Sequence, residues 1–248
     1  MQKRLSTLPM TLTLALTLAT CGGLYWGISQ WLFTPLSLPQ VERLRMQAPT
    51  VPEALAQLRT AARHEQREAQ RALAQLWLTG PNSQDSSHWQ EGLKYAELAA
   101  KQGDREAWLL LAQAYLYGRG GARDYPRARY WFERAAQQQS AAAAYGLGLM
   151  YKSGYGGPRD PAMAYNWFVQ AAQKGHADAM FMLGNAYQDG EGVTADAELA
   201  SKWFQAAAQL EHPLALQSLA TLQTNPALRA HLLQELGEEV ARPQWLAH

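Results

Sequence analysis

The sequence predicts an all-α protein: a right-handed α-solenoid of helix–turn–helix repeats, preceded by one N-terminal transmembrane helix. Three observations support this prediction. Aromatic, glycine and alanine residues recur 36 residues apart over much of the chain, and the apolar residues within each recurrence follow a helical period. An apolar stretch without charged residues stands near the N-terminus.

The apolar stretch is long enough to cross a lipid bilayer. It covers residues 10–33, follows a short basic segment at 1–9, and would reach roughly 36 Å as a helix, against a hydrocarbon core of roughly 30 Å. Tyr25, Trp26 and Trp31 stand toward its far end, where aromatic side chains favour the membrane interface. The basic residues before the stretch favour an orientation with the N-terminus in the cytoplasm. We therefore expect a single-pass protein of the bacterial inner membrane with its repeat domain in the periplasm.

Two other interpretations of this segment stay open. The letters "LATC", ending at Cys21, resemble a bacterial lipobox, so Cys21 is a candidate lipidation site of an anchored lipoprotein. A cleaved signal peptide is the third possibility. All three interpretations place the chain beyond about residue 40 outside the cytoplasm. Because Cys21 is the single cysteine, the chain forms no internal disulfide and no cysteine-rich zinc site.

A proline-rich stretch follows, at residues 34–52. It carries four prolines, which remove backbone donors and favour an extended linker, with part of the stretch folding back on the next helix as the alternative. Residues 53–68 then predict a leading helix, which either continues into the following apolar segment or ends before it.

The repeats begin at residue 69. Trp131, Trp167 and Trp203 are in register, and the phenylalanine after each of them and the alanine pair that follows recur with them. The boundaries that this register predicts are 69–104 for a degenerate first repeat, then 105–140, 141–176 and 177–212, and 213–248 for a partial repeat with a C-terminal capping helix. We expect the alanines to let neighbouring helices approach and the tryptophans to fill the space between them.

A glycine-containing loop joins the two helices of each repeat. Glycines such as Gly190 and Gly192 end the first helix because they adopt positive φ angles freely, and Asp124, Asp160 and Asp196 are placed to cap the second helix. A nucleotide site is not expected, because the loops lack the Gly-Lys-Ser/Thr ending of a phosphate loop and follow no strand.

The pattern A-x-x-x-L-G-x-x-Y-x-x-G-x-G-x-x-x-D-x-x-x-A-x-x-W-F-x-x-A-A, clearest at residues 177–210, resembles the Sel-one-like repeat, a relative of the tetratricopeptide repeat. Ala112 and Gln139 depart from it, since the family has glycine at both positions. The resemblance implies an α-solenoid whose first helices line a concave side, and a scaffold or adaptor that binds partner proteins or peptides.

Candidate partner-binding residues occupy the flank of the first helices, at positions that the repeat pattern does not require. One apolar or aromatic row among them, formed by Leu109, Tyr145 and Phe181, is typical of a peptide groove, with packing between adjacent first helices as the alternative. The full set is Leu109, Gln113, Leu116, Tyr145, Leu149, Lys152, Phe181, Asn185 and Gln188.

Composition argues against other classes of function. A net charge of +1 and scattered histidines predict no nucleic-acid site and no metal site, and no motif predicts a cofactor or an enzyme. His176 and His212 share a repeat position and read as residues of the loops between repeats. We therefore expect a membrane-tethered extracytoplasmic scaffold that binds a protein or peptide of an envelope complex. The alternative is a regulator of an envelope enzyme that binds a cell-wall glycan or peptidoglycan fragment.

Overall fold

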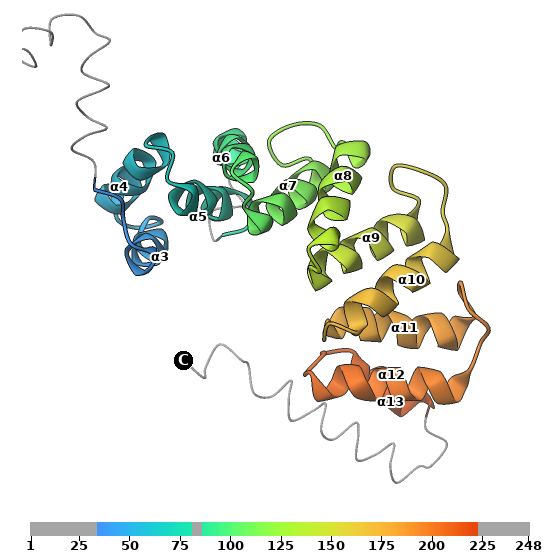
Figure 1. Ribbon diagram of the computed structural model, residues 1–248. Helices are drawn as coiled ribbons and strands as arrows, with labels where there is room; N and C mark the ends of the chain where they lie inside the picture. Colours follow the sequence, from blue (N-terminus) through green and yellow to red (C-terminus); the bar gives the residue numbers. More distant parts are fainter. Residues whose placement is uncertain (1–33, 81–85, 223–248) are drawn as a thin grey trace, which may run out of the picture. The chain divides into compact units, whose positions relative to one another are not determined.

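The computed structural model describes residues 34–80 and 86–222, and these residues form helices and connecting loops without a strand (Figure 1). The chain divides into two compact units, Met1–Leu73 and Ala74–His248. The helix labels used below are those of Figure 1.

The proline-rich segment of the first unit contains a helix. Residues Leu38–Gln47 form α3, which packs on α4 and buries Val41 to 1% exposure. The Gln66 side chain fixes the start of the segment, because it donates a hydrogen bond to the Leu36 carbonyl and accepts one from the Leu36 amide. The expectation of an extended linker over 34–52 is therefore wrong for α3, and folding back on the next helix is what the structure shows.

The leading segment and the apolar segment after it form two helices, which is one of the two alternatives that the sequence left open. The first, α4, spans Pro52–Arg63, and α5 spans Arg67–Leu78. Glu65, between them, has a φ of 60°, a left-handed conformation that interrupts the helical hydrogen bonds. Proline opens both α3 and α4 within the first turn, where its missing amide removes no helical hydrogen bond.

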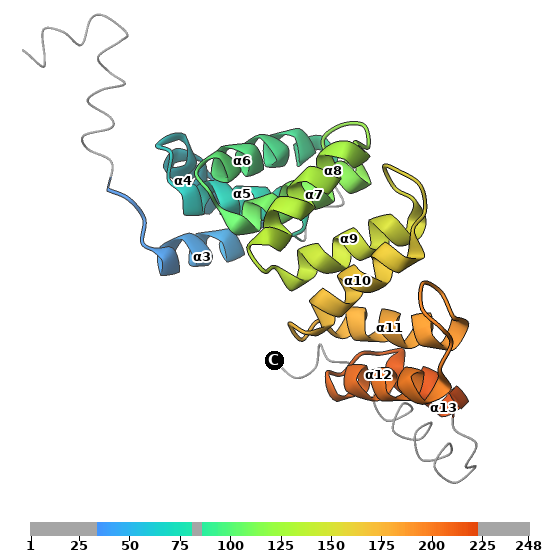
Figure 2. The same cartoon turned by 45° about the vertical axis from the view of Figure 1, so that its right-hand side comes forward.

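Helix pairs follow one another through the second unit (Figures 1 and 2). After the short 3-10 helix η2 (Ser86–His88), the bounds are α6 Trp89–Lys101, α7 Arg105–Tyr117, α8 Tyr125–Gln137, α9 Ala141–Ser153, α10 Pro161–Ala172, α11 Ala177–Asp189, α12 Ala197–Gln209 and α13 Ala215–Leu222. Each pair packs internally and on the next, so that α8 contacts α9, α10 contacts α11 and α12 contacts α13. This serial arrangement is that of a solenoid.

The glycine loops are turns, as predicted. The helices α7, α9 and α11 end at Gly118, Gly154 and Gly190, whose φ angles are 73°, 71° and 69°. The same bond closes each loop, from the amide of the capping aspartate to the carbonyl of the tyrosine three residues before that glycine, at 2.9 Å. The side chains of the capping residues Asp124, Asp160 and Asp196 accept from amides in the first turn of α8, α10 and α12.

Phenylalanine, more than tryptophan, fills the space between the helices. Phe132, Phe168 and Phe204 are at most 2% exposed, whereas the tryptophan before each of them is only half-buried. A Cβ built on Gly184 would come within 2.5 Å of the Phe204 ring, and one on Gly148 would clash with Phe168 in the same way. The glycines therefore leave room for these rings, and the prediction that the tryptophans fill the space is only partly correct.

The second glycine of each loop lets successive repeats approach closely. A Cβ on Gly156 would lie 2.9 Å from the Cβ of Tyr125, which begins α8, and one on Gly120 would lie 3.0 Å from the Trp89 carbonyl. Gly192 lies in the same way against Pro161 at the start of α10. Each loop thus rests on the first residue of the preceding second helix, which explains why the loop needs two glycines.

Some predicted features fall outside the described residues. The predicted transmembrane segment 10–33, the candidate lipidation site Cys21 and the greater part of the predicted capping segment 213–248 are among them; from that last segment the structure describes α13. Within residues 34–80 and 86–222, no helix has the length and apolar character needed to cross a membrane.

Candidate interaction surface

The predicted row on the first helices is packed against its own chain at two of its three positions. The Tyr145 ring stacks on His176 with centroids 4.6 Å apart and lies 5.9 Å from Phe168. The Phe181 ring stacks on His212 at 4.3 Å and lies 5.5 Å from Phe204. Both rings therefore pack within the chain, which was the alternative to contact with a partner. A ring that is covered on two sides leaves only part of its surface for a partner.

The remaining candidate residues differ in exposure. Leu116 is 7% exposed and offers no contact surface. Gln188 is exposed, and Lys152 is half-buried and pairs with Glu191. Half-buried positions, which keep some surface free, are Leu109, Gln113, Leu149 and Asn185. Contact of these residues with a partner stays a prediction.

Two histidines and an aspartate come together between the last repeats. Asp178, near the start of α11, lies 3.8 Å from His176 Nδ1 and 3.3 Å from His212 Nε2. Burial lowers the pKa of the His176 imidazole, and the Asp178 carboxylate opposes that shift. Burial of the Tyr145 hydroxyl raises its pKa, and the negative charge of Asp178 raises it further. The shared repeat position of the histidines was visible in the sequence, but their shared aspartate was not.

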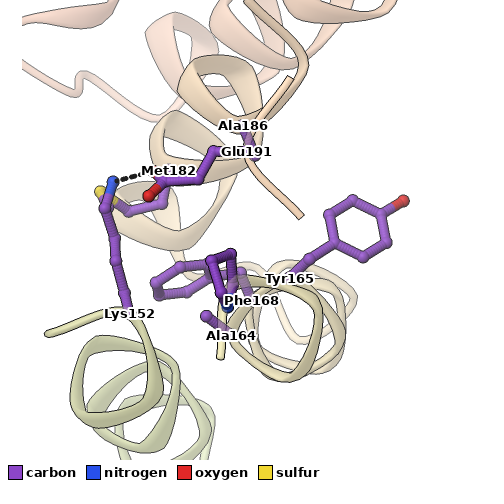
Figure 3. A pocket seen from close by; sticks show the side chains of 8 residues that line it. Lys152, Ala164, Tyr165, Phe168, Met182, Ala186 and Glu191 are labelled. Atoms are coloured by element: carbon purple, nitrogen blue, oxygen red, sulfur yellow. Dashed lines mark ion pairs between the residues drawn. The ribbon is translucent and has the colours of Figure 1, made fainter. Parts of the chain in front are cut away.

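A small pocket opens between α9, α10 and α11 (Figure 3). Its empty volume is about 220 Å³, part of which is open solvent. The lining residues are Lys152, Pro161, Ala164, Tyr165, Phe168, Met182, Ala186 and Glu191. Of these, only Lys152 is among the sequence candidates, and Ala164 and Phe168 stand at positions that the repeat pattern assigns to packing.

The rim of the pocket is charged and the interior is apolar. The Lys152 Nζ lies 3.2 Å from Glu191 Oε2, and Arg159 contacts the other oxygen of the same carboxylate. In Figure 3 the Phe168 ring lies beside the Lys152 side chain, whereas the Tyr165 ring points away from it. Two cations share one anion here, so the rim carries an excess of positive charge.

Tyrosines tie neighbouring repeats together beside the pocket. The hydroxyls of Tyr165 on α10 and Tyr187 on α11 are 2.7 Å apart, and burial together with this hydrogen bond raises the pKa of Tyr165 to about 12. One repeat earlier, the Arg129 guanidinium lies 4.9 Å from the centre of the Tyr151 ring. These contacts hold the helices that form the pocket in a fixed register.

The rim of this opening, more than its depth, offers contacts to a partner. The enclosed space holds no more than about one water molecule, so a partner would contact the cations Lys152 and Arg159 at the surface rather than insert a side chain. Among residues 34–80 and 86–222 there is no group of three histidine, cysteine, aspartate or glutamate side chains that could hold a metal ion.

Comparisons with known proteins agree with the fold. A Sel1 repeat protein from Oxalobacter formigenes superposes with a TM-score of 0.65 at 26% identity, over 74% of this chain and 75% of that one. A protective antigen of uropathogenic Escherichia coli with an SLR fold gives 0.68 at 27% identity, over 81% of this chain and 45% of that one. A Sel1 repeat protein from Klebsiella pneumoniae subsp. pneumoniae gives 0.50 at 23% identity, over 74% and 91%.

The sequence itself matches a family model four times. No curated protein gives a significant match. The model of the Sel1 repeat, however, matches residues 67–104, 106–140, 141–176 and 177–212. These matches cover more than half of the chain, and they coincide with the helix pairs from α5/α6 to α11/α12. The chain therefore belongs to the Sel1 repeat family.

Proposed function

We propose that this protein is a scaffold that binds a partner protein through the face formed by α9, α10 and α11, and that its N-terminal segment tethers it to a membrane of the cell envelope. Sel1 repeat proteins generally mediate protein–protein interactions and are generally non-enzymatic. The observation that supports this face is the excess positive charge of Lys152 and Arg159 beside a shallow opening lined by apolar side chains. The tether rests on the apolar sequence at 10–33 alone.

Site-specific photo-crosslinking tests the binding face. A photoreactive amino acid is introduced into the full-length chain at Met182, in the pocket, or at Gln188, exposed at the end of α11. We expect one discrete cross-linked protein from both positions in the cells that make this chain. Gln137, exposed at the end of α8, is the matched control and should give none. The face is wrong if all three positions give the same products.

The glycan alternative is tested with the same proteins. Peptidoglycan fragments are titrated against the purified full-length chain, and binding is followed by the fluorescence of its tryptophans. If the fragments bind and no protein is cross-linked at Met182 or Gln188, the scaffold proposal is wrong and a glycan-binding regulator is favoured.

Membrane attachment requires a separate experiment. We expect the full-length chain to resist extraction from membranes by alkaline buffer and a chain lacking residues 1–33 to be released. Mass spectrometry of the N-terminus then distinguishes a retained span from lipidation at Cys21, because only the latter begins at a lipid-modified cysteine. Release of the full-length chain would contradict the tether.

A further inference from the structure

Charge is distributed unevenly along the repeats. Residues 105–140 contain six arginines and three acidic residues, whereas residues 177–212 contain one lysine and six acidic residues. The difference is concentrated in equivalent parts of the two repeats: 117–127 carries three arginines and one aspartate, and 189–199 carries four acidic residues and no basic one. Two repeats that share a fold therefore present opposite charge.

These charges lie along one side of the second unit. The loops 118–124, 154–160 and 190–196, with the helix ends beside them, form what we call the loop edge. In Figures 1 and 2 the three loops follow one another along the same side of the helix pairs. The close approach of each second glycine to the preceding second helix, and the contacts of Lys152 and Arg159 with Glu191, keep them in that order.

Part of this charge is available to a partner. On the basic side Arg123 is exposed, and the exposed Arg127 side chain lies 5.4 Å from the centre of the Tyr115 ring and 3.2 Å from Asp124. On the acidic side Asp189 is exposed, and the Glu198 side chain remains 79% exposed although it contacts Lys202. The loop edge thus ends in a basic patch in repeat 2 and an acidic patch in repeat 4.

We propose that the loop edge binds the loop edge of a second copy of this chain, in antiparallel orientation. The two patches stand one repeat before and one repeat after the loop at 154–160. A two-fold axis through that loop therefore places the basic patch of each copy against the acidic patch of the other, which is the self-complementary arrangement of an isologous dimer. Charge complementarity of this kind selects a partner and its orientation.

The loop at the axis is suited to meet its own copy. It contains Gly156, Gly157 and Pro158, which leave little side-chain bulk, and Tyr155, which is 41% exposed and stacks on Tyr125 at 5.0 Å. Its cation, Arg159, contacts Glu191 of the same chain, and Lys152 shares that carboxylate, so the positive charge that two copies bring together there is partly neutralised. Exposed tyrosine beside arginine is the composition of protein interfaces.

Charge reversal tests the proposal in the full-length chain, kept in detergent micelles. One variant makes repeat 2 acidic (Arg123→Glu with Arg127→Glu) and another makes repeat 4 basic (Asp189→Lys with Glu198→Lys). Two differently tagged copies are mixed and their association is measured by co-capture and by sedimentation. We expect the wild-type chain to self-associate at low salt and to lose about tenfold or more in affinity at roughly 0.5 M salt.

Each reversed variant alone should lose self-association by about tenfold or more, because the substituted residues then face charges of their own sign in the second copy. Mixing the two variants should restore association, since every contact becomes complementary again. Arg105→Glu, which reverses an exposed charge at the opposite end of α7, is the matched control and should change nothing. Circular dichroism confirms that each variant is folded.

Three results would overturn the proposal: a wild-type chain that is monomeric at low salt, association that survives reversal of either patch, or a mixture that fails to associate. The apolar segment 10–33 is the same in all variants, so differences among them report on the loop edge alone. Gln188 adjoins Asp189 on the loop edge, so mass spectrometry must identify what is cross-linked there. A different protein cross-linked at Met182 to a chain that stays monomeric would overturn the dimer alone, and self-association with only the chain itself cross-linked would overturn the proposed function alone.

Discussion

Repeats 2 and 4 accommodate the same buried ring in different ways. In repeat 4, Phe204 lies over Gly184 on the first helix of its own repeat. Repeat 2 has Ala112 at the position of that glycine, and its ring, Phe132, lies instead over Gly146 on the first helix of the next repeat. The comparison shows that the fold requires a glycine under each ring but not at one fixed position in the pattern.

The two ends of the repeat array also differ in how their first helices begin. Asp104 and Ser140 precede α7 and α9, and their side chains accept hydrogen bonds from amides of the first turn. His176 occupies that position before α11 without such a bond and stacks on Tyr145 instead. A capping position in the early repeats is therefore a ring-stacking position in a later one.

The largest effect is expected from removing the buried rings themselves. Phe204→Ala and Phe132→Ala should each cost about 3–5 kcal/mol of unfolding free energy, because both leave a cavity among tightly packed helices. Urea unfolding measures the cost. Tyr130→Ala removes a ring that is 52% exposed from the same helix as Phe132 and is the control. A cost below about 1 kcal/mol for Phe132→Ala would mean that the contact across the repeat boundary does not hold the ring.

Filling the glycine under a ring should have the next largest effect. Gly146→Ala and Gly184→Ala should each cost about 1–3 kcal/mol, since the added methyl group meets a ring that has no room to move. Gly121→Ala, where nothing lies within 4 Å of the added group, should stay within about 0.5 kcal/mol.

A double-mutant cycle sharpens the comparison between the repeats. Ala112→Gly gives repeat 2 the glycine of repeat 4, so the cost of Gly146→Ala should become smaller in that background. Urea unfolding of the four proteins gives the coupling energy, which we expect to exceed about 0.5 kcal/mol. If the costs of Ala112→Gly and Gly146→Ala are strictly additive, the Phe132 ring does not move between the two glycine positions.

The half-buried His176 ring predicts that stability depends on pH. Burial holds the pKa of His176 below its unfolded value of 6.5, so folding favours the neutral ring. Above pH 6.5 the neutral ring makes its full contribution to the free energy of unfolding. As the pH falls from 6.5 toward the lower pKa of the folded state, that contribution is lost. Urea midpoints at several pH values between 8 and 5 measure the loss. The variant His176→Gln should show a shallower decline, and an unchanged decline would assign the effect to other groups.

The smallest effect concerns the residue after the second helix. Its φ is left-handed in equivalent positions, at 81° in Gly103, 63° in Gln139, 80° in Gly175 and 58° in Glu211. A left-handed conformation costs a side-chain-bearing residue more than glycine, so Gln139→Gly should raise stability by about 0.5–1 kcal/mol and Gly175→Gln should lower it by a similar amount. Thermal melting measures both changes, and a destabilising Gln139→Gly would show that the contact between Gln139 and Lys174 outweighs the backbone term.

The repeat fold was predictable because its signals are local. Gly190 ends a helix and Asp196 caps the next one through bonds to nearby residues, and each signal recurs at a fixed spacing. Helix α3 also carries a local signal, since the Gln40 side chain accepts a hydrogen bond from the Ser37 amide at its start, but the linker prediction did not use it. Its prolines favoured an extended chain, whereas the contact that fixes its start joins Leu36 to Gln66, 30 residues away.

The site was less predictable than the fold, because it is built from contacts between repeats. Tyr165 meets Tyr187, and Lys152 meets Glu191, only when two units are stacked. Phe168 and Trp167 look equivalent in the repeat pattern, and the clash that a Cβ on Gly148 would produce distinguishes the buried ring from the half-buried one. Such preferences depend on packing geometry, which a periodic pattern does not contain.

The position of Gly146 has a consequence for how such a chain can lengthen. Repeats 3 and 4 each carry the glycine for their own ring, so duplicating either one in tandem supplies every new phenylalanine with a place. A duplicated repeat 2 would instead set its ring against Leu110, the residue that corresponds to Gly146, and moving repeat 4 behind it would bring Met182 there. The residue at this one position therefore limits which repeat can follow repeat 2. Duplication of repeat 3 or repeat 4 is compatible with the packing of the rings, whereas duplication of repeat 2 is not.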